Sequence, residues 1–252
     1  MVDGPPKIAD VVARMDRLLA PLEAEKDERR HFLATYRRTT IAVGEEVERG
    51  GFLDGAWVEL WDVAFASMYL DALEQWDREG TAPGPWAVAF EAARSEDLPP
   101  VRHTLLGMNA HINYDLPQAL LAVITDMEFT NPDVIARWAL DHGHIDAILV
   151  TRVPEEDKEL LKVEEPGDRS LLDRLLTPFN QAGTKRFLRE ARGKVWHNAS
   201  LLSAARVQGE EALAARVAEL EELAKARVAD LRAPGQVLLR LARHGFGVEL
   251  DR

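Results

Sequence analysis

The chain has 252 residues, no cysteine and a formal net charge of −12. Without cysteine there are no disulfides, thiolate metal ligands or cysteine nucleophiles, so any metal would have to be bound by His, Asp or Glu. The acidic balance argues against nucleic acid and anionic membranes as partners. No stretch approaches the roughly 18 apolar residues of a membrane span, and the first residues lack the apolar core of a secretory signal. A cytoplasmic globular protein is expected.

Apolar residues recur every three or four positions along most of the chain, which predicts an all-α fold. We expect about nine helices in one compact domain covering residues 1–252, with a core at about 7–206, a C-terminal helical extension at 207–252 and a kinked central helix. Gly and Pro punctuation sets the expected helix ends. Expected helices cover about 8–22, 25–48, 54–80, 85–96, 101–114, 116–129, 131–143, 170–178, 182–206 and 210–231, followed by a short last helix.

The pattern is weakest between residues 144 and 168. "IDAILVTRV" has the branched residues of a strand, and the acidic stretch after it reads as an exposed loop with one helical turn. Just before it, "DHGH" places His142 and His144 around Gly143. We expect a helix C-terminus there, where histidine suits the helix dipole, and a pair of metal ligands is the alternative.

The segment "VRHTLLGMNAHINYDLPQAL" has the strongest chemical pattern in the chain. His103, Gly107, His111 and Asp115 follow one another at intervals of four, so neighbours in this series share a helix face. A His-x-x-x-Asp pair can supply two ligands to one metal, and it can also orient an imidazole as a general base. Gly107 would leave room beside the pair for a ligand or another backbone. The segment is therefore a candidate site.

A purely structural interpretation of the same segment stays open. Pro117 cannot donate to the helix ladder, and Asp115 with Gln118 resembles a capping box, so Asp115 could cap a second helix. Asn109 and Asn113 are unusual in a helix interior, and their amides could bind a substrate.

Asp62 lies in the middle of an apolar helix stripe that includes Phe65 and Tyr69. A carboxylate in that position must be paired, bound to metal or protonated, because an isolated buried charge is too costly. We predict Asp62 as a catalytic or metal-binding group and Tyr69 as a substrate contact. The alternative is that Asp62 joins two helices through an Arg or a backbone amide.

Arg189, Arg192 and Trp196 share one face of a later predicted helix. The two arginines could neutralise Asp62 or Asp115 or bind an anionic substrate group, and the alternative is a solvated face. His197, next along, is expected to be partly exposed.

Three segments together resemble a family of unknown function that is found mostly in actinobacteria. They are "GFLDGAWVELWDVAFASMYLDAL", "LLGMNAHINYDLPQAL" and "LLTPFNQAGTKRFLREARGKVWHNASLL". The similarity covers about residues 40–205, and the Asn-Ala-His-Ile-Asn-x-Asp-Leu core is its most specific part. Because the family has no established activity, the resemblance implies little about chemistry.

The residues favour a cytoplasmic helical enzyme with a His/Asp pocket. A metal-dependent hydrolase would use His103, His111, Asp115 and Asp62 around Zn or Fe and act on a small, partly apolar substrate. One alternative is a metal-free acid–base or biosynthetic enzyme with His111 as the base. Another is a non-enzymatic binding or scaffold protein. The Ala/Glu-rich helix at 210–231 could pair with a second copy in a homodimer.

Overall fold

A computed structural model describes residues 5–95, 98–163, 180–235 and 237–251. These residues form helices and no strand, which confirms the all-α prediction. In chain order the helices are α1 Ile8–Glu25, α2 Arg30–Glu48, α3 Gly55–Glu79, α4 Gly84–Ser95, α5 Pro100–Ala110, the π-helix η1 His111–Asp115, α6 Leu116–Val123, α7 Asp126–Phe129, α8 Pro132–Val163, α10 Asn180–Gln208, α11 Glu210–Arg232 and α12 Val237–His244.

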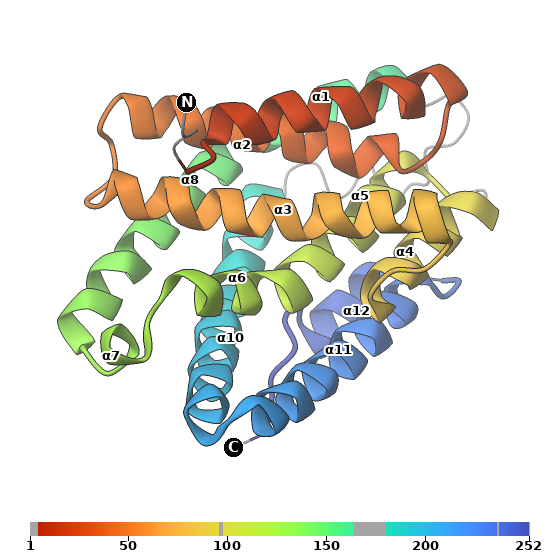
Figure 1. Cartoon of the computed structure of the whole chain (residues 1–252). Coiled ribbons are helices and arrows are strands. Elements are labelled where there is room, and N and C mark those ends of the chain that lie inside the picture. Colours follow the sequence, from red (N-terminus) through yellow and green to blue (C-terminus); the bar gives the residue numbers. More distant parts are fainter. Residues whose placement is uncertain (1–4, 96–97, 164–179, 236, 252) are drawn as a thin grey trace.

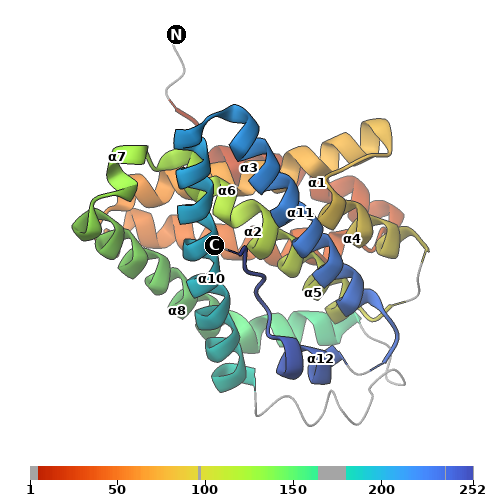
Figure 2. The same ribbon diagram turned by 90° about the horizontal axis from the view of Figure 1, so that it is seen from below.

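The helices form one body in which the central rod α5–η1–α6 is enclosed by its neighbours. Helices α1, α2 and α3 form one side, and α10 with α11 closes the opposite side (Figure 1). Seen from below, α12 and the C-terminal segment lie near α10 and α11 (Figure 2). The core includes side chains from both sides, such as Met15, Leu33, Leu70 and Val195. The rod that carries the predicted site is thus the middle of the molecule.

Local signals place several helix ends where the sequence predicts them. The Asp54 carboxylate accepts the backbone N–H of Trp57 at 3.1 Å and caps α3. Helix α3 ends at Gly80, whose φ of 69° suits a residue without a side chain. Asp141 on α8 adds to the cap, because its two carboxylate oxygens accept the N–H groups of Leu53 and Asp54.

The predicted helix at 131–143 is present, and Oδ1 of its predicted cap Asn131 accepts the N–H of Asp133 at 3.1 Å. The predictions for its end and for residues 144–163 are wrong. Helix α8 runs without interruption through Gly143 to Val163, so the segment holds neither a helix stop at Gly143 nor a strand. His142 is buried beside the rings of Trp61 and Trp196, and His144 pairs with Glu46 at 2.9 Å. Tertiary contacts therefore sustain the helix where local propensity is weak. The predicted helix at 170–178 lies outside the described residues.

The central helix contains a π-turn at the position where a kink is predicted. The N–H of Leu116 bonds to the carbonyl of His111, five residues back, and α6 then continues the rod. Pro117 has no N–H to donate to the carbonyl of Asn113, so the ordinary α-helical bond is missing there. The side-chain amide of Gln118 donates to the carbonyl of Tyr114 at 2.8 Å. A single π-turn of this kind absorbs a proline within a helix.

The apolar stripe of helix α11 is buried against other helices of the same molecule. Leu220, Ala224, Val228 and Leu231 are fully buried, and α11 packs on α4, α5 and α10. A homodimer through residues 210–231 stays a prediction, and only the outer face of α11 is left for it, where Leu223 is 37% exposed.

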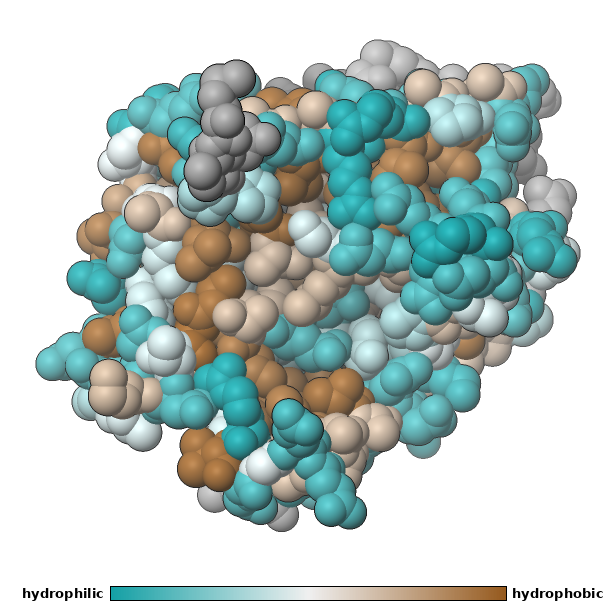
Figure 3. Space-filling view, in the orientation of Figure 1, coloured by the Kyte–Doolittle hydropathy of each residue, from teal (hydrophilic) through white to brown (hydrophobic). Residues whose placement is uncertain are grey.

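Apolar side chains also reach the surface elsewhere. Figure 3 shows an apolar band on the face of Figure 1, with hydrophilic side chains beside it. Within the described residues, no helix combines the length and apolar character that crossing a bilayer demands.

Candidate active site around His111

His111 and Asp115 form a buried pair inside η1. Nδ1 of His111 lies 2.7 Å from Oδ2 of Asp115, and the two residues are 3% and 2% exposed. The indole N–H of Trp86, on α4, donates to the same oxygen at 2.9 Å. Since that oxygen accepts the Trp86 proton, we assign the His111 proton to Nδ1, which leaves a lone pair on Nε2. Nε2 is buried and has no hydrogen-bond partner.

This geometry overturns the capping interpretation of Asp115. Asp115 has α-helical dihedral angles, and its side chain accepts no capping hydrogen bond. Burial lowers the pKa of His111 and raises the pKa of Asp115, while the hydrogen bond between them opposes both shifts. A neutral imidazole held through Nδ1 with a bare Nε2 is the arrangement of an oriented general base.

Aromatic rings enclose the imidazole on several sides. The Phe65 ring from α3 stacks on it with a centroid distance of 3.6 Å and an angle of 5° between the planes. Tyr36 from α2 meets it edge-on at 4.5 Å, and Phe32, Tyr69 and Trp86 lie at 5.9, 6.0 and 5.9 Å. These rings exclude water, and this explains why burial is the largest influence on the pKa of His111.

Asp62 and Tyr36 bring two more unpartnered polar atoms to this region. Oδ2 of Asp62 and the hydroxyl of Tyr36 are buried without a close hydrogen-bond partner, and the effect of burial on the pKa of Tyr36 outweighs that of a weak contact with the Thr40 side chain, which lowers it. Burial alone raises the pKa of Asp62 to about 7, so no positive charge stabilises its carboxylate. Burial raises the pKa of Tyr36 as well, and the charges of Asp62 and Asp115 raise it further. Asp62 lies about one turn before Phe65 on α3, and the Phe65 ring stacks on the imidazole. Of the choices predicted for Asp62, protonation fits best.

The four predicted metal ligands are not gathered at one point. His111 and Asp115 touch, but His103 lies beside His31, with ring centroids 6.4 Å apart, and its Nε2 is 3.9 Å from Glu28. Among the described residues no group of three or more His, Asp or Glu side chains is arranged to hold a metal ion. The sequence spacing placed His103 on the same helix face, but eight residues of helix separate it from His111 by more than two turns.

Gly107 does not leave free space above the pair, as the sequence suggested. The Phe32 side chain fills that space, and a Cβ at position 107 would lie 2.8 Å from its Cδ2. The missing side chain therefore permits a close approach of α2 to α5.

Asn109 and Asn113 bind the C-terminal segment of the chain instead of facing the candidate site. Both amides donate to the carbonyl of Phe246 at 3.0 Å, and the N–H of Val248 donates to Oδ1 of Asn113 at 2.9 Å. Asn198 repeats the pattern, since its amide donates to the carbonyl of Val248 and its Oδ1 accepts the N–H of Leu250. The predicted substrate role of Asn109 and Asn113 is therefore replaced by a structural one.

The residues predicted on α10 lie away from His111. Arg192 forms an ion pair with Asp146 on α8, and the Trp196 ring faces His142 at 6.0 Å. Arg189 is exposed. Of the alternatives given for these arginines, neutralising Asp62 or Asp115 has no support, because the charge of neither arginine acts on the pKa of either group. His197 is partly exposed as predicted, and its Nε2 lies 3.1 Å from the carbonyl of Leu250.

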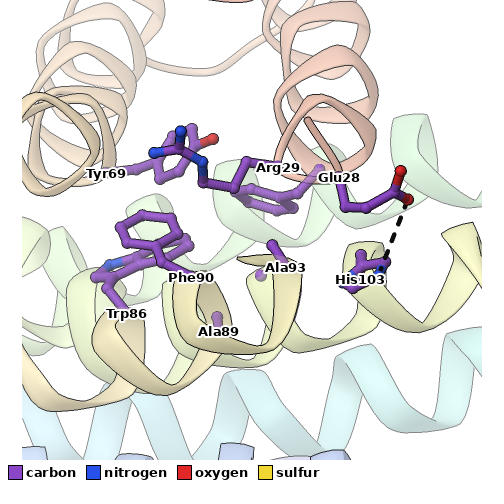
Figure 4. Close-up of a pocket in the computed structure, with 10 residues that line it drawn as sticks. Glu28, Arg29, Tyr69, Trp86, Ala89, Phe90, Ala93 and His103 are labelled. Carbon is purple, nitrogen blue, oxygen red and sulfur yellow. Dashed lines mark ion pairs between the residues drawn. The ribbon is translucent and has the colours of Figure 1, made fainter. Parts of the chain in front are cut away.

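A small surface pocket with about 20 Å³ of free space, room for one water molecule, lies against the rings that enclose His111. Figure 4 shows its lining. Tyr69, Trp86 and Phe90 line one side, and Glu28 turns toward His103 on the other. Arg29 also lines it, with its guanidinium bound to Asp27 and Asp77. The complete lining is Glu28, Arg29, Phe32, Tyr69, Trp86, Ala89, Phe90, Ala93, His103 and Gly107.

Comparison with known proteins identifies the family but no activity. The model of a family of unknown function, DUF5995, matches residues 8–234. The chain belongs to this family. No curated protein and no solved structure matches it. The match to DUF5995 extends beyond the residues 40–205 on which the resemblance was seen, and it includes α1, α2 and α11.

Several residues around His111 in this DUF5995 member escape sequence analysis. Tyr36, Phe32 and Trp86 lie on α2 and α4, and their apolar or aromatic character is what any helix core contains. Tyr36 stands in "YRRTT", where the neighbouring arginines suggest a basic surface rather than a buried ring. Only their contacts in the folded protein, with His111 and Asp115, distinguish these three residues from ordinary core residues.

Proposed function

We propose that this protein is a metal-free acid–base enzyme that moves a proton within a small, uncharged, mostly apolar substrate. His111 is the base and Asp115 orients it. One observation carries the proposal: Nδ1 of His111 is held by Asp115 while Nε2, buried and neutral, has no partner. An unpartnered buried acceptor costs about 1–3 kcal/mol, and a substrate proton would satisfy it. The metal-dependent form of the predicted enzyme has less support, since the predicted ligands lie apart.

The acid side of the reaction comes from Asp62 and Tyr36. With a pKa of about 7, the Asp62 carboxyl group keeps its proton below that pH and can donate a hydrogen bond. The Tyr36 hydroxyl keeps its proton at any ordinary pH because its pKa is raised. A neutral carboxylic acid and a tyrosine in an apolar site can stabilise an oxyanion that forms on a substrate carbonyl.

The reaction type that suits these groups is enolisation. Nε2 of His111 takes a proton from the carbon next to a carbonyl group. The electron pair of that C–H bond forms a C=C bond, and the π pair of the carbonyl moves to its oxygen. Tyr36 and Asp62 donate hydrogen bonds to this oxygen. The imidazolium exchanges its proton with the solvent when the site is open, and it returns a proton to the same carbon, or to the γ-carbon of a substrate with a β,γ double bond, so no other reactant is consumed. A positioned base contributes about 10²–10⁴-fold, and each oxyanion donor adds about 10²–10³-fold.

The test is hydrogen–deuterium exchange at the α-carbons of cyclohexanone in D₂O, followed by proton NMR. We expect the wild-type protein to accelerate exchange at least about 10²-fold above buffer, and His111→Gln to remove that acceleration. Tyr36→Phe should retain the base but lower the rate by about tenfold or more. The matched control is His197→Gln, which alters a histidine outside the site. Wild-type exchange at the buffer rate, or full activity in His111→Gln, would refute the proposal.

A binding or structural protein is the second candidate, and the enclosure of His111 favours it. Five aromatic rings surround the imidazole, so a substrate must displace at least one of them. On this alternative His111→Gln changes stability without any loss of exchange activity.

The proposal includes a cytoplasmic location and a small-molecule ligand rather than nucleic acid. The net charge of −12 disfavours nucleic acid as a ligand. The chain has no cysteine that an oxidising compartment would pair into disulfides, in line with a cytoplasmic location.

A further inference from the structure

The surface pocket and the buried pair share one wall. Phe32, Tyr69 and Trp86 line the pocket, and the centroids of the same three rings lie 5.9, 6.0 and 5.9 Å from the centroid of His111. One layer of rings therefore lies between this pocket and the imidazole. A molecule in this pocket can reach Nε2 only if one of the three rings moves.

Phe32 is the ring that can leave with the least disturbance. Trp86 is bound through its indole N–H to Asp115, and Tyr69 is 1% exposed in the middle of α3. The Phe32 ring makes no hydrogen bond, and it lies over Gly107, where α5 presents no side chain. If the side chain rotates away, the space left behind has Gly107 as its floor and Tyr69, Trp86 and Tyr36 around it.

That space accepts a single six-membered ring, because it holds one now. It also favours an uncharged molecule. Arg29 is already neutralised by Asp27 and Asp77, and Glu28 is paired with Arg30 at 3.0 Å, so neither charge at the pocket is free. An anion entering this site would lose its hydration without gaining a free counter-charge from the pocket lining.

We propose that an uncharged molecule with one six-membered ring and one oxygen atom binds in the place of the Phe32 ring, against Gly107 and His111. It enters from the pocket of Figure 4, and its oxygen points to Tyr36 and Asp62. The direction of the oxygen rests on the function proposed above, whereas the ring site rests on the packing of Phe32. Phe32 thereby determines both the size of the ligand and its access to the base.

Phenol is a suitable probe, since it is a stable planar analogue of an enol with one ring and one oxygen. Its binding to the full-length protein is measured by calorimetry and by the indole N–H resonance of Trp86 in NMR spectra. Benzene lacks the oxygen and benzoate carries a charge. We expect phenol to bind at least about tenfold more tightly than either, because neither can satisfy the unpartnered polar atoms without penalty.

Two large-to-small variants test the role of Phe32. Phe32→Ala opens the proposed ring site in advance, so phenol should bind about tenfold more tightly than to the wild type. Phe52→Ala removes an equal volume at a buried ring outside the pocket lining, where Phe52 packs on His144. It should change phenol affinity by less than about twofold. Phe32→Leu, a milder change, should give a smaller gain in the same direction if Phe32→Ala does not fold.

Two results would overturn the inference: equal affinity for phenol, benzene and benzoate, or an equal gain from Phe52→Ala and Phe32→Ala. Its failure is distinguishable from failure of the proposed function. Exchange activity that depends on His111, with phenol binding that does not depend on Phe32, rejects the ring site alone. Phenol binding that depends on Phe32, with no exchange activity, supports the ring site and rejects the enzyme.

Discussion

The Phe32 ring lies directly on Gly107, so that a Cβ at position 107 would be 2.8 Å from Cδ2 and 2.9 Å from Cβ of Phe32. This contact brings α2 against α5 one helical turn before His111. It makes the absence of a side chain at position 107 a condition for the aromatic enclosure of the imidazole.

Gly107→Ala should destabilise the protein by about 1–3 kcal/mol, because the added methyl group forces Phe32 out of its place. Gly193→Ala is the matched control, since nothing lies within 4 Å of its Cβ position on α10. That change should leave stability unchanged or raise it by up to about 1 kcal/mol. Urea unfolding of both variants measures the difference. Equal effects at the two positions would contradict the packing described for Phe32.

Asp62→Asn should raise the melting temperature at high pH and have little effect at low pH. The folded-state pKa of Asp62, about 7, is above its unfolded-state value of about 4. The folded protein therefore holds a proton that the unfolded chain releases between these values, and the free energy of unfolding falls as the pH rises through this window. The amide introduced by the substitution cannot ionise, so the variant lacks this loss. The melting temperatures of the wild type and the variant, measured at about pH 5 and about pH 8, check this prediction. An equal increase in melting temperature at both pH values would contradict a raised pKa of buried Asp62 as the cause of the increase.

His111→Ala should lower the free energy of unfolding by about 3–5 kcal/mol, since it leaves Asp115 buried without its imidazole partner and removes the ring stacked on Phe65. Asp115→Asn should cost less, because an amide oxygen can still accept the N–H groups of Trp86 and His111. His197→Ala, at a partly exposed histidine, should cost about 1 kcal/mol or less. Denaturant titration of the three variants compares them. A cost for His111→Ala no greater than that for His197→Ala would argue against a tightly bonded pair.

Asn113→Ala should destabilise the protein by about 1–3 kcal/mol more than Asn109→Ala. Asn113 accepts the N–H of Val248, which then has no partner, whereas the Phe246 carbonyl that Asn109 binds still accepts the amide of Asn113. Hydrogen exchange of the Val248 amide reports the local effect, and urea unfolding reports the total. Exchange of this amide at the wild-type rate in Asn113→Ala would contradict the assigned hydrogen bond.

Local sequence patterns were enough to predict the helical class, most helix ends and the pairing of His111 with Asp115. Apolar periodicity defines the helices. The carboxylate of Asp54 caps the start of α3, Gly80 ends it through its backbone conformation, and residues four apart on a helix necessarily approach each other. The same patterns identified Asp62 as a carboxyl group that must be neutralised, because its place in an apolar stripe requires burial.

The surroundings of these residues, in contrast, depend on tertiary packing. Tyr36 and Trp86 come from α2 and α4, and no spacing within α5 predicts that their polar atoms approach the pair. The partner of Asn113 lies more than 130 residues away in the chain. The sequence alone therefore does not distinguish a side-chain amide that binds a substrate from one that holds a distant segment in place. His103 lies on the same helix face as His111, but its neighbours are His31 and Glu28, whereas His111 contacts Asp115 and the aromatic rings. Helical periodicity sets the direction of a side chain, whereas its chemistry depends on the helices that pack against it, and packing between distant segments is not encoded in local spacing.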